Sequence, residues 1–99
     1  MFDRNQLEQI EKGIIAGVNV SIYAKPEFVW EQMRQIRLGM ACGLNVSVYA
    51  NPKFDWDQMA EIRWGLEDGV DASIYAKPEF DSEQMERIRL KLEEEKNNV

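Results

Sequence analysis

A 26-residue period organises this 99-residue chain. The segment GVNVSIYAKPEF begins at Gly17, and close copies of it begin at Gly43 and Gly69. A period of about 20 to 50 residues is typical of stacked repeats, in which neighbouring units bury a core that one unit cannot bury alone. We therefore expect a single repeat domain over residues 1–99, made of units 2–27, 28–53 and 54–79 and a truncated unit 80–99.

The first half of each unit predicts a helix with clear start and stop signals. Asp55 and Gln58 have the spacing of a capping box, in which two side chains satisfy backbone N–H groups reciprocally. Val29 replaces the aspartate in the second unit, so that helix should have the weakest cap. Gly69 follows where a left-handed residue would end the helix in a Schellman motif.

Apolar spacing identifies the buried face of this helix. Met59, Ile62 and Leu66 follow the i, i+3, i+7 pattern of a core-facing stripe. A glycine inside the helix, such as Gly65, costs about 1 kcal/mol relative to alanine, which indicates close approach of a neighbouring segment. Three further residues at the 26-residue spacing are expected to lie in the core, with their hydroxyl groups on water or backbone: Tyr23, Tyr49 and Tyr75.

The second half of each unit allows two interpretations. The alternation in NVSIYA is compatible with a strand, and a helix plus a short strand would make an α/β leucine-rich-like solenoid. However, Asn19 and its counterparts Asn45 and Asp71 directly follow the glycine stop and are favoured helix N-caps. The proline that follows suits the end of a short helix. We favour a long helix, a tight turn and a helix of one to two turns.

The last unit differs from the others in a way that suits the end of a stack. Lys91 and Glu95 stand where the earlier units have glycine, so the helix can continue as a polar cap. Repeat proteins need such capping units for solubility. The sequence therefore predicts an all-α, right-handed solenoid of helix–turn–short-helix repeats that ends in a C-terminal capping helix.

The pattern YAxPxFxxxQMxxIRxGLxxG resembles a short tandem repeat of uncharacterised proteins from Gram-positive bacteria, their phages and mobile elements. The resemblance covers nearly the whole chain, although Leu7 and Glu11 depart from it in the first unit. Its recurring residues look structural. The resemblance therefore implies a fold and a habitat rather than an activity.

Composition argues against several functional classes. The formal charge of −6 disfavours direct binding of nucleic acid, which needs clustered cations. The chain has no histidine, and its only cysteine, Cys42, is expected to be a small buried or half-buried residue. The carboxylates fall at helix starts or on polar faces, so we predict no catalytic, cofactor-binding or metal-binding residues. The lone cysteine and the absence of signal-peptide or membrane-span patterns indicate a cytoplasmic protein that does not bind membranes.

Positions that vary between units are the candidate partner-binding residues. Leu38, Trp64 and Leu90 share one helical position away from the core stripe and should form an apolar row. Trp30 with Arg37, and Trp56 with Arg63, lie on one flank. Exposed Trp and Arg dominate binding hot spots. The two flank tryptophans could also fill gaps between units.

These features predict a non-enzymatic, protein-binding or self-assembling repeat module, whose partner is another protein or a second copy of the chain. The alternative is a small acidic inhibitor or nucleic-acid mimic from a phage or mobile element that blocks a basic protein. The two classes differ in salt dependence. Binding by a mimic should weaken steeply as salt is added, whereas a contact centred on Trp and Leu should not.

Overall fold

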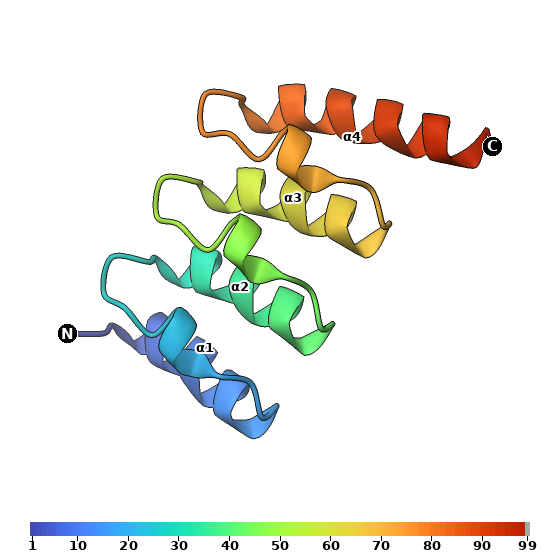
Figure 1. Cartoon of the computed structure of the whole chain (residues 1–99). Helices are drawn as coiled ribbons and strands as arrows, with labels where there is room; N and C mark the ends of the chain where they lie inside the picture. Colours follow the sequence, from blue (N-terminus) through green and yellow to red (C-terminus); the bar gives the residue numbers. More distant parts are fainter. Residues whose placement is uncertain (99) are drawn as a thin grey trace.

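The computed structural model describes residues 1–98, and all of their regular structure is helical. Four α-helices alternate with three single turns of 3-10 helix (Figure 1). The all-α class predicted from the sequence is confirmed, and Val99 at the end of the predicted unit 80–99 lies outside the described residues. The elements in chain order are α1 (Arg4–Ile15), η1 (Val20–Ile22), α2 (Trp30–Ala41), η2 (Val46–Val48), α3 (Trp56–Glu67), η3 (Ala72–Ile74) and α4 (Ser82–Asn97).

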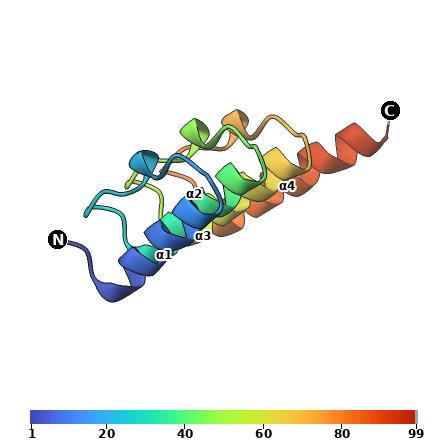
Figure 2. The same cartoon turned by 90° about the horizontal axis from the view of Figure 1, so that it is seen from below.

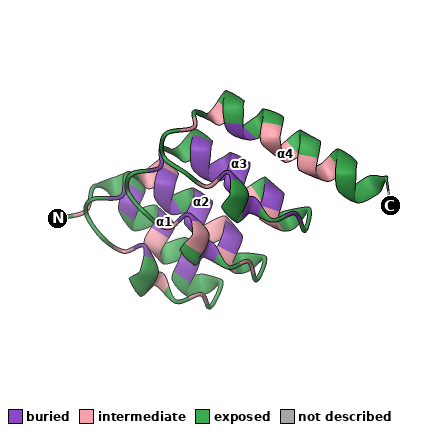
Figure 3. Cartoon of the chain, turned by 45° about the horizontal axis from the view of Figure 1, so that its top comes forward, coloured by how far each residue is buried: buried purple, intermediate pink, exposed green. Residues whose placement is uncertain are grey.

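The helices form two layers. The α-helices lie side by side in chain order, and the closest contacts between them join successive helices (Figure 1). The 3-10 turns lie together on one face of this α layer (Figure 2). The backbone measures 46 × 27 × 16 Å, which describes a thin slab. Burial is concentrated on α2 and α3, which have a neighbour on both sides (Figure 3).

The helix starts follow the predicted capping boxes. In α1, α3 and α4 the capping aspartate accepts a 2.8 Å hydrogen bond from the backbone N–H of the glutamine three residues later. In α2, Val29 has no side-chain acceptor, and only the reciprocal bond from the Val29 N–H to Gln32 Oε1 remains, at 2.9 Å. The predicted weakness of this cap is therefore confirmed.

The helix stops are Schellman motifs, as predicted. Gly17, Gly43 and Gly69 have φ angles of +76°, +72° and +76°, in the left-handed region where glycine carries no Cβ penalty. Around Gly43, the Leu44 N–H donates to the Gly39 carbonyl at 2.9 Å, the long hydrogen bond of this motif. Cys42 forms the C-cap of α2 and is exposed, so the expectation that it would be buried or half-buried is wrong. The reason is its place at the end of the helix, where its Sγ lies 3.9 Å from Glu67 Oε1 of α3 but remains open to solvent.

The second element of each unit is a single 3-10 turn of three residues, shorter than the upper limit of two turns expected from the sequence. Asn19 and Asp71 cap η1 and η3 by accepting a hydrogen bond from the backbone N–H two residues later. Residues 1–98 contain no strand, so the leucine-rich-like alternative is wrong. The local cap prevails over the alternating pattern because the capped turn directs its first residue and the following tyrosine towards the α layer, whereas its last residue stays partly exposed, as at Ile22 and Ile74.

The units are also joined by glutamine side chains, which the sequence analysis treated only as half of a capping box. Gln6 Nε2 donates a 2.6 Å hydrogen bond to the Phe28 carbonyl at the start of the next unit. Gln32 and Gln58 make the same 2.6 Å bond to the carbonyls of Phe54 and Phe80. One side chain therefore both begins its own helix and fixes the loop that leads into the next helix.

Candidate binding groove on the α layer

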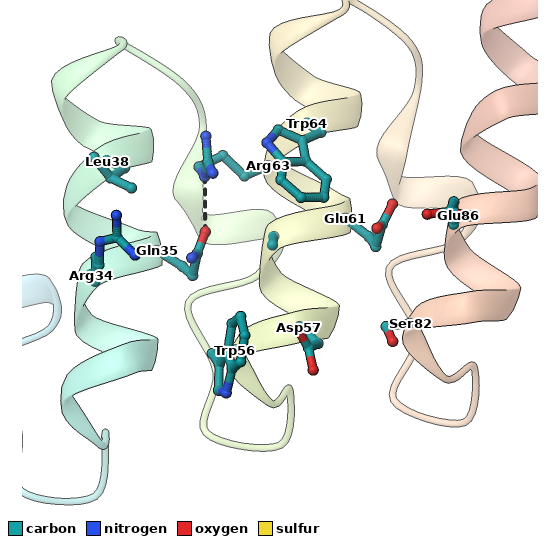
Figure 4. Close-up of a pocket in the computed structure, with 11 residues that line it drawn as sticks. Arg34, Gln35, Leu38, Trp56, Asp57, Glu61, Arg63, Trp64, Ser82 and Glu86 are labelled. Atoms are coloured by element: carbon teal, nitrogen blue, oxygen red, sulfur yellow. Dashed lines mark hydrogen bonds between the residues drawn. The ribbon is translucent and has the colours of Figure 1, made fainter.

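The face of the α layer carries a groove of about 440 Å³ that crosses α2, α3 and α4 (Figure 4). The lining comes entirely from these helices and includes the predicted residues Leu38, Trp56, Arg63 and Trp64. Ala60 lies between the two tryptophans of α3, at the position that holds Arg34 in α2 and Glu86 in α4. The small alanine side chain leaves the groove open at its centre.

A second hollow, of about 230 Å³, adjoins the groove across α2 and α3. It is lined by Trp30 and Glu31, together with Arg34, Gln35 and Trp56. The last three residues also line the larger groove, so the two hollows form one continuous surface. We call this surface, with all the residues that line either hollow, the tryptophan groove.

The tryptophans differ in exposure although Trp30 and Trp56 hold the same position in their helices. Trp30 is half-buried, whereas Trp56 and Trp64 are 44% and 42% exposed. The matching position in α4 is Ser82, which also lines the larger groove. Because serine is small, it leaves the α4 side of Trp56 uncovered. The sequence is compatible with either a core or a surface role for the flank tryptophans. In the structure Trp30 is the more buried of the two, and Trp56 is the more exposed.

The flank arginines tie successive helices together. Arg37 Nε donates to Gln9 Oε1 at 3.0 Å, and Arg63 Nε donates to Gln35 Oε1 at 2.9 Å. The series ends with Arg89, whose Nε lies 2.9 Å from Oε1 of the buried Glu61. Burial opposes the charge of Arg89, but hydrogen bonds to Glu61 and Glu93 outweigh it and raise the pKa of this guanidinium group. Arginine in this position therefore links successive helices at each junction, and Arg63 also lines the groove.

Two of these arginines also flank Trp64. The guanidinium carbons of Arg63 and Arg89 each lie 5.7 Å from the centroid of the indole ring. This distance is within the range of cation–π attraction. Since both arginines are fixed by hydrogen bonds to α2 and α3 side chains, they hold the exposed ring in one orientation. A side chain that is already ordered loses less entropy when a partner covers it.

The seven predicted residues do not all meet in one place. Leu38, Trp30, Trp56, Arg63 and Trp64 line the tryptophan groove, whereas Arg37 and Leu90 lie outside its lining. Within the predicted apolar row, Leu38 is half-buried and Leu90 is 49% exposed. Eight further residues line the groove and were not predicted: Glu31, Arg34, Gln35, Asp57, Ala60, Glu61, Ser82 and Glu86. Three of them could have been found from the sequence, since they share one position of the repeat, which changes from Arg34 to Ala60 to Glu86.

In the larger hollow of the groove, basic and acidic side chains lie on different sides. Arg34 lies on the α2 side, whereas Asp57 and Glu86 lie towards α4 (Figure 4). Residues 1–98 contain no group of three potential metal ligands close enough to hold an ion. None of the helices in the described part of the chain is long and apolar enough to cross a membrane. The arrangement is suited to binding by apolar contact with charges at the rim.

Comparison with known proteins adds no assignment: no protein-family model matches the chain, and no curated protein or solved structure shows significant similarity to it.

Proposed function

We propose that the chain is a cytoplasmic, non-enzymatic protein-binding module built as a right-handed solenoid, and that the tryptophan groove is its binding surface. The observation that carries this proposal is the placement of Trp56 and Trp64. Both rings are nearly half exposed, and they stand on either side of Ala60 in a hollow that crosses three helices. The stacking of successive α-helices supports the solenoid, and its handedness follows from the sequence prediction alone.

The composition of the groove favours a protein as the partner. Tryptophan and arginine are the residues most enriched in hot spots, where a few central side chains supply most of the binding energy. The groove combines these residues with a rim of opposite charges from Arg34 and Glu86. A peptide with one or two large apolar side chains, and with charges of both signs beside them, has the complementary chemistry.

The test is selection of peptides from a displayed random library against the whole chain. Selected peptides are then measured against a double variant, Trp56→Ser with Trp64→Ser, by calorimetric titration. We expect the double variant to bind at least about tenfold more weakly, which corresponds to about 1.4 kcal/mol. Its far-UV circular dichroism should be unchanged, because neither side chain belongs to the buried core cluster.

The matched control is Ile74→Ser. Ile74 is 48% exposed, like the two tryptophans, but belongs to η3 in the other layer. Peptides that bind the Ile74→Ser variant and the wild type equally, but not the double variant, support the groove. Peptides that bind all three proteins equally would contradict it.

The same titrations distinguish the alternative of an acidic inhibitor or nucleic-acid mimic. The acidic cluster at the ends of α3 and α4 has its own cations: Glu67 pairs with Arg63 at 2.7 Å, and Glu93 pairs with Arg89 at 2.9 Å. These pairs neutralise part of the negative charge of this cluster, which disfavours the mimic. Affinity that falls steeply with salt, and survives loss of both tryptophans, would favour the mimic instead.

A further inference from the structure

The two ends of the stack expose faces that are buried at every internal junction. Leu7 of α1 is 47% exposed, whereas the residues at the same position of the later helices, Met33, Met59 and Met85, are fully buried. Ile14 is 62% exposed, whereas its counterparts Met40, Leu66 and Leu92 are half-buried. The cause is that, within residues 1–98, only α2 packs beside α1 in the α layer, and it lies on the other side (Figure 1). We call the side of α1 that bears Leu7, Glu11 and Ile14 the leading face.

The opposite face of α4 is open in the corresponding way. Gln84 and Arg87 are exposed, whereas the residues at their positions in α1, α2 and α3 are all buried. At those internal junctions the glutamine Nε2 donates to the phenylalanine carbonyl 22 residues later. Among the described residues, the Gln84 side chain bonds only within its own capping box. We call the side of α4 that bears Gln84 and Arg87 the trailing face.

The charges at these ends are complementary, and they stand at the same repeat positions as the residues that pair at the internal junctions. At each internal junction an arginine donates to an acceptor 28 residues earlier, on the preceding helix: Arg37 to Gln9, Arg63 to Gln35 and Arg89 to Glu61. The arginine position holds Glu11 in α1, and the acceptor position holds Arg87 in α4. The two charges have therefore exchanged places at the open ends: the acidic residue lies on α1, where internal junctions have the arginine, and the arginine lies on α4, where they have the acceptor. Neither Glu11 nor Arg87 forms an ion pair within residues 1–98.

We infer that the occupant of the leading face is the trailing face of a second copy, so that the protein associates head to tail through a pairing of Arg87 with Glu11 of the next copy. Gln84 would then reach the Phe2 carbonyl of that copy, because the internal spacing of 22 residues continues across the junction when α1 follows α4. A head-to-tail dimer of identical copies still has one free leading face and one free trailing face, so association continues to larger oligomers, as an open filament or a closed ring, rather than stopping at a dimer.

The junction is weaker than the internal ones. No 3-10 turn follows α4 in the described part of the chain, so the contact lacks the buried tyrosine that each internal junction contains. Lys91 also occupies the position where a glycine admits that tyrosine in the other helices. We therefore place the dissociation constant between about 10 µM and about 1 mM. The inference concerns the ends of the stack and does not depend on the tryptophan groove.

The experiment is sedimentation velocity of the full chain over this concentration range. The weight-average sedimentation coefficient should rise with concentration without levelling at a dimer. The single variants Glu11→Arg and Arg87→Glu each place like charges at the junction, and each should weaken association at least about tenfold. Both positions are exposed, so circular dichroism and the thermal midpoint should not change.

Two restorations make the test specific. The double variant, Glu11→Arg with Arg87→Glu, creates the same polarity as the internal pair of Glu61 with Arg89 and should recover association. An equimolar mixture of the two single variants should also recover it, since each head then meets a tail of opposite charge. The controls Glu27→Arg and Lys53→Glu make the same changes in net charge on exposed loops and should have no effect, singly or mixed.

Three results would overturn the inference. The first is a monomer over the whole range. The second is association that the control substitutions weaken as much as the junction substitutions. The third is association that Leu7→Ser abolishes but neither charge reversal affects, which would indicate that two copies of α1 pack against each other instead.

Discussion

The phenolic oxygen of Tyr49 donates a 2.6 Å hydrogen bond to the backbone carbonyl of Gln35, in space left by the absent side chain of Gly39. A Cβ on Gly39 would lie 2.1 Å from that oxygen. The same arrangement joins Tyr23 to α1 and Tyr75 to α3. Each tyrosine is fully buried, so one glycine per unit is what allows the 3-10 layer to pack on the α layer.

Gly39→Ala should destabilise the protein by about 2 kcal/mol, because overpacking and the lost hydrogen bond exceed the roughly 1 kcal/mol that alanine gains in a helix. Denaturant unfolding measures the change. Tyr49→Phe removes the clashing oxygen, so adding it to Gly39→Ala should cost much less than the sum of the single changes. Simple additivity of the two would show that the contact between Gly39 and Tyr49 is not what the substitution disturbs.

Truncation of the core should cost more in the middle of the stack than at its end. Ile62 is fully buried between two neighbouring helices, whereas Ile88 in α4 is half-buried. Ile62→Ala should destabilise by about 2–5 kcal/mol, and Ile88→Ala should cost less. Equal losses in urea denaturation would argue against a stack whose end unit is packed on one side only.

The missing helix cap offers a stabilising substitution. Val29 is 52% exposed and has the extended backbone of an N-cap, with φ of −72° and ψ of 162°. Val29→Asp would supply the acceptor that Asp55 provides to Gln58 in α3. We expect a gain of about 1 kcal/mol in the free energy of unfolding. Val29→Ala, which removes the valine without adding an acceptor, is the control, and a gain of similar size from it would rule out capping as the cause.

Removing Arg89 should destabilise the fold more than removing the charge of its partner Glu61. Glu61→Gln restores the Gln–Arg pairing of the other two junctions, and its effect should stay within about 1 kcal/mol. Arg89→Leu leaves a buried carboxylate without its partner and should cost about 2 kcal/mol or more. Chemical denaturation of the two single variants and the double variant tests this. Adding Glu61→Gln to Arg89→Leu should recover part of the lost stability. If it does not, Arg89 stabilises the fold through another contact, for example with Trp64.

Buried tyrosines should make the fold sensitive to alkali. Burial raises the pKa of Tyr23, Tyr49 and Tyr75 above the ordinary value of about 10, and the nearby arginines only partly offset it. Since the folded-state pKa is the higher one, the stability contributed by the buried, neutral tyrosines is fully present below about pH 10 and is lost as the pH rises above it. Tyrosinate absorbance should therefore appear together with the loss of helical circular dichroism. Tyrosinate that forms while the helices persist would contradict this prediction.

Much of the local structure could be predicted from the sequence because its causes are local. The aspartate and glutamine of a capping box lie three residues apart, and the glycine stop depends on the φ angle of one residue. A period of 26 residues then requires that each unit repeat the same turns. The helix starts, the helix stops and the all-α class follow from these short-range constraints.

Only the tertiary structure decided which side chains act between units. Arg63 looked like a surface residue, yet its Nε bonds to Gln35, 28 residues earlier, and Gln58 reaches the Phe80 carbonyl, 22 residues later. The groove depends in the same way on what the adjacent helices place around Ala60. Helical periodicity assigns a residue to one face of its own helix, but burial is decided by the side chains that the neighbouring helices bring to that face. For this reason Trp30 and Trp56 differ in exposure although they share one position in the repeat.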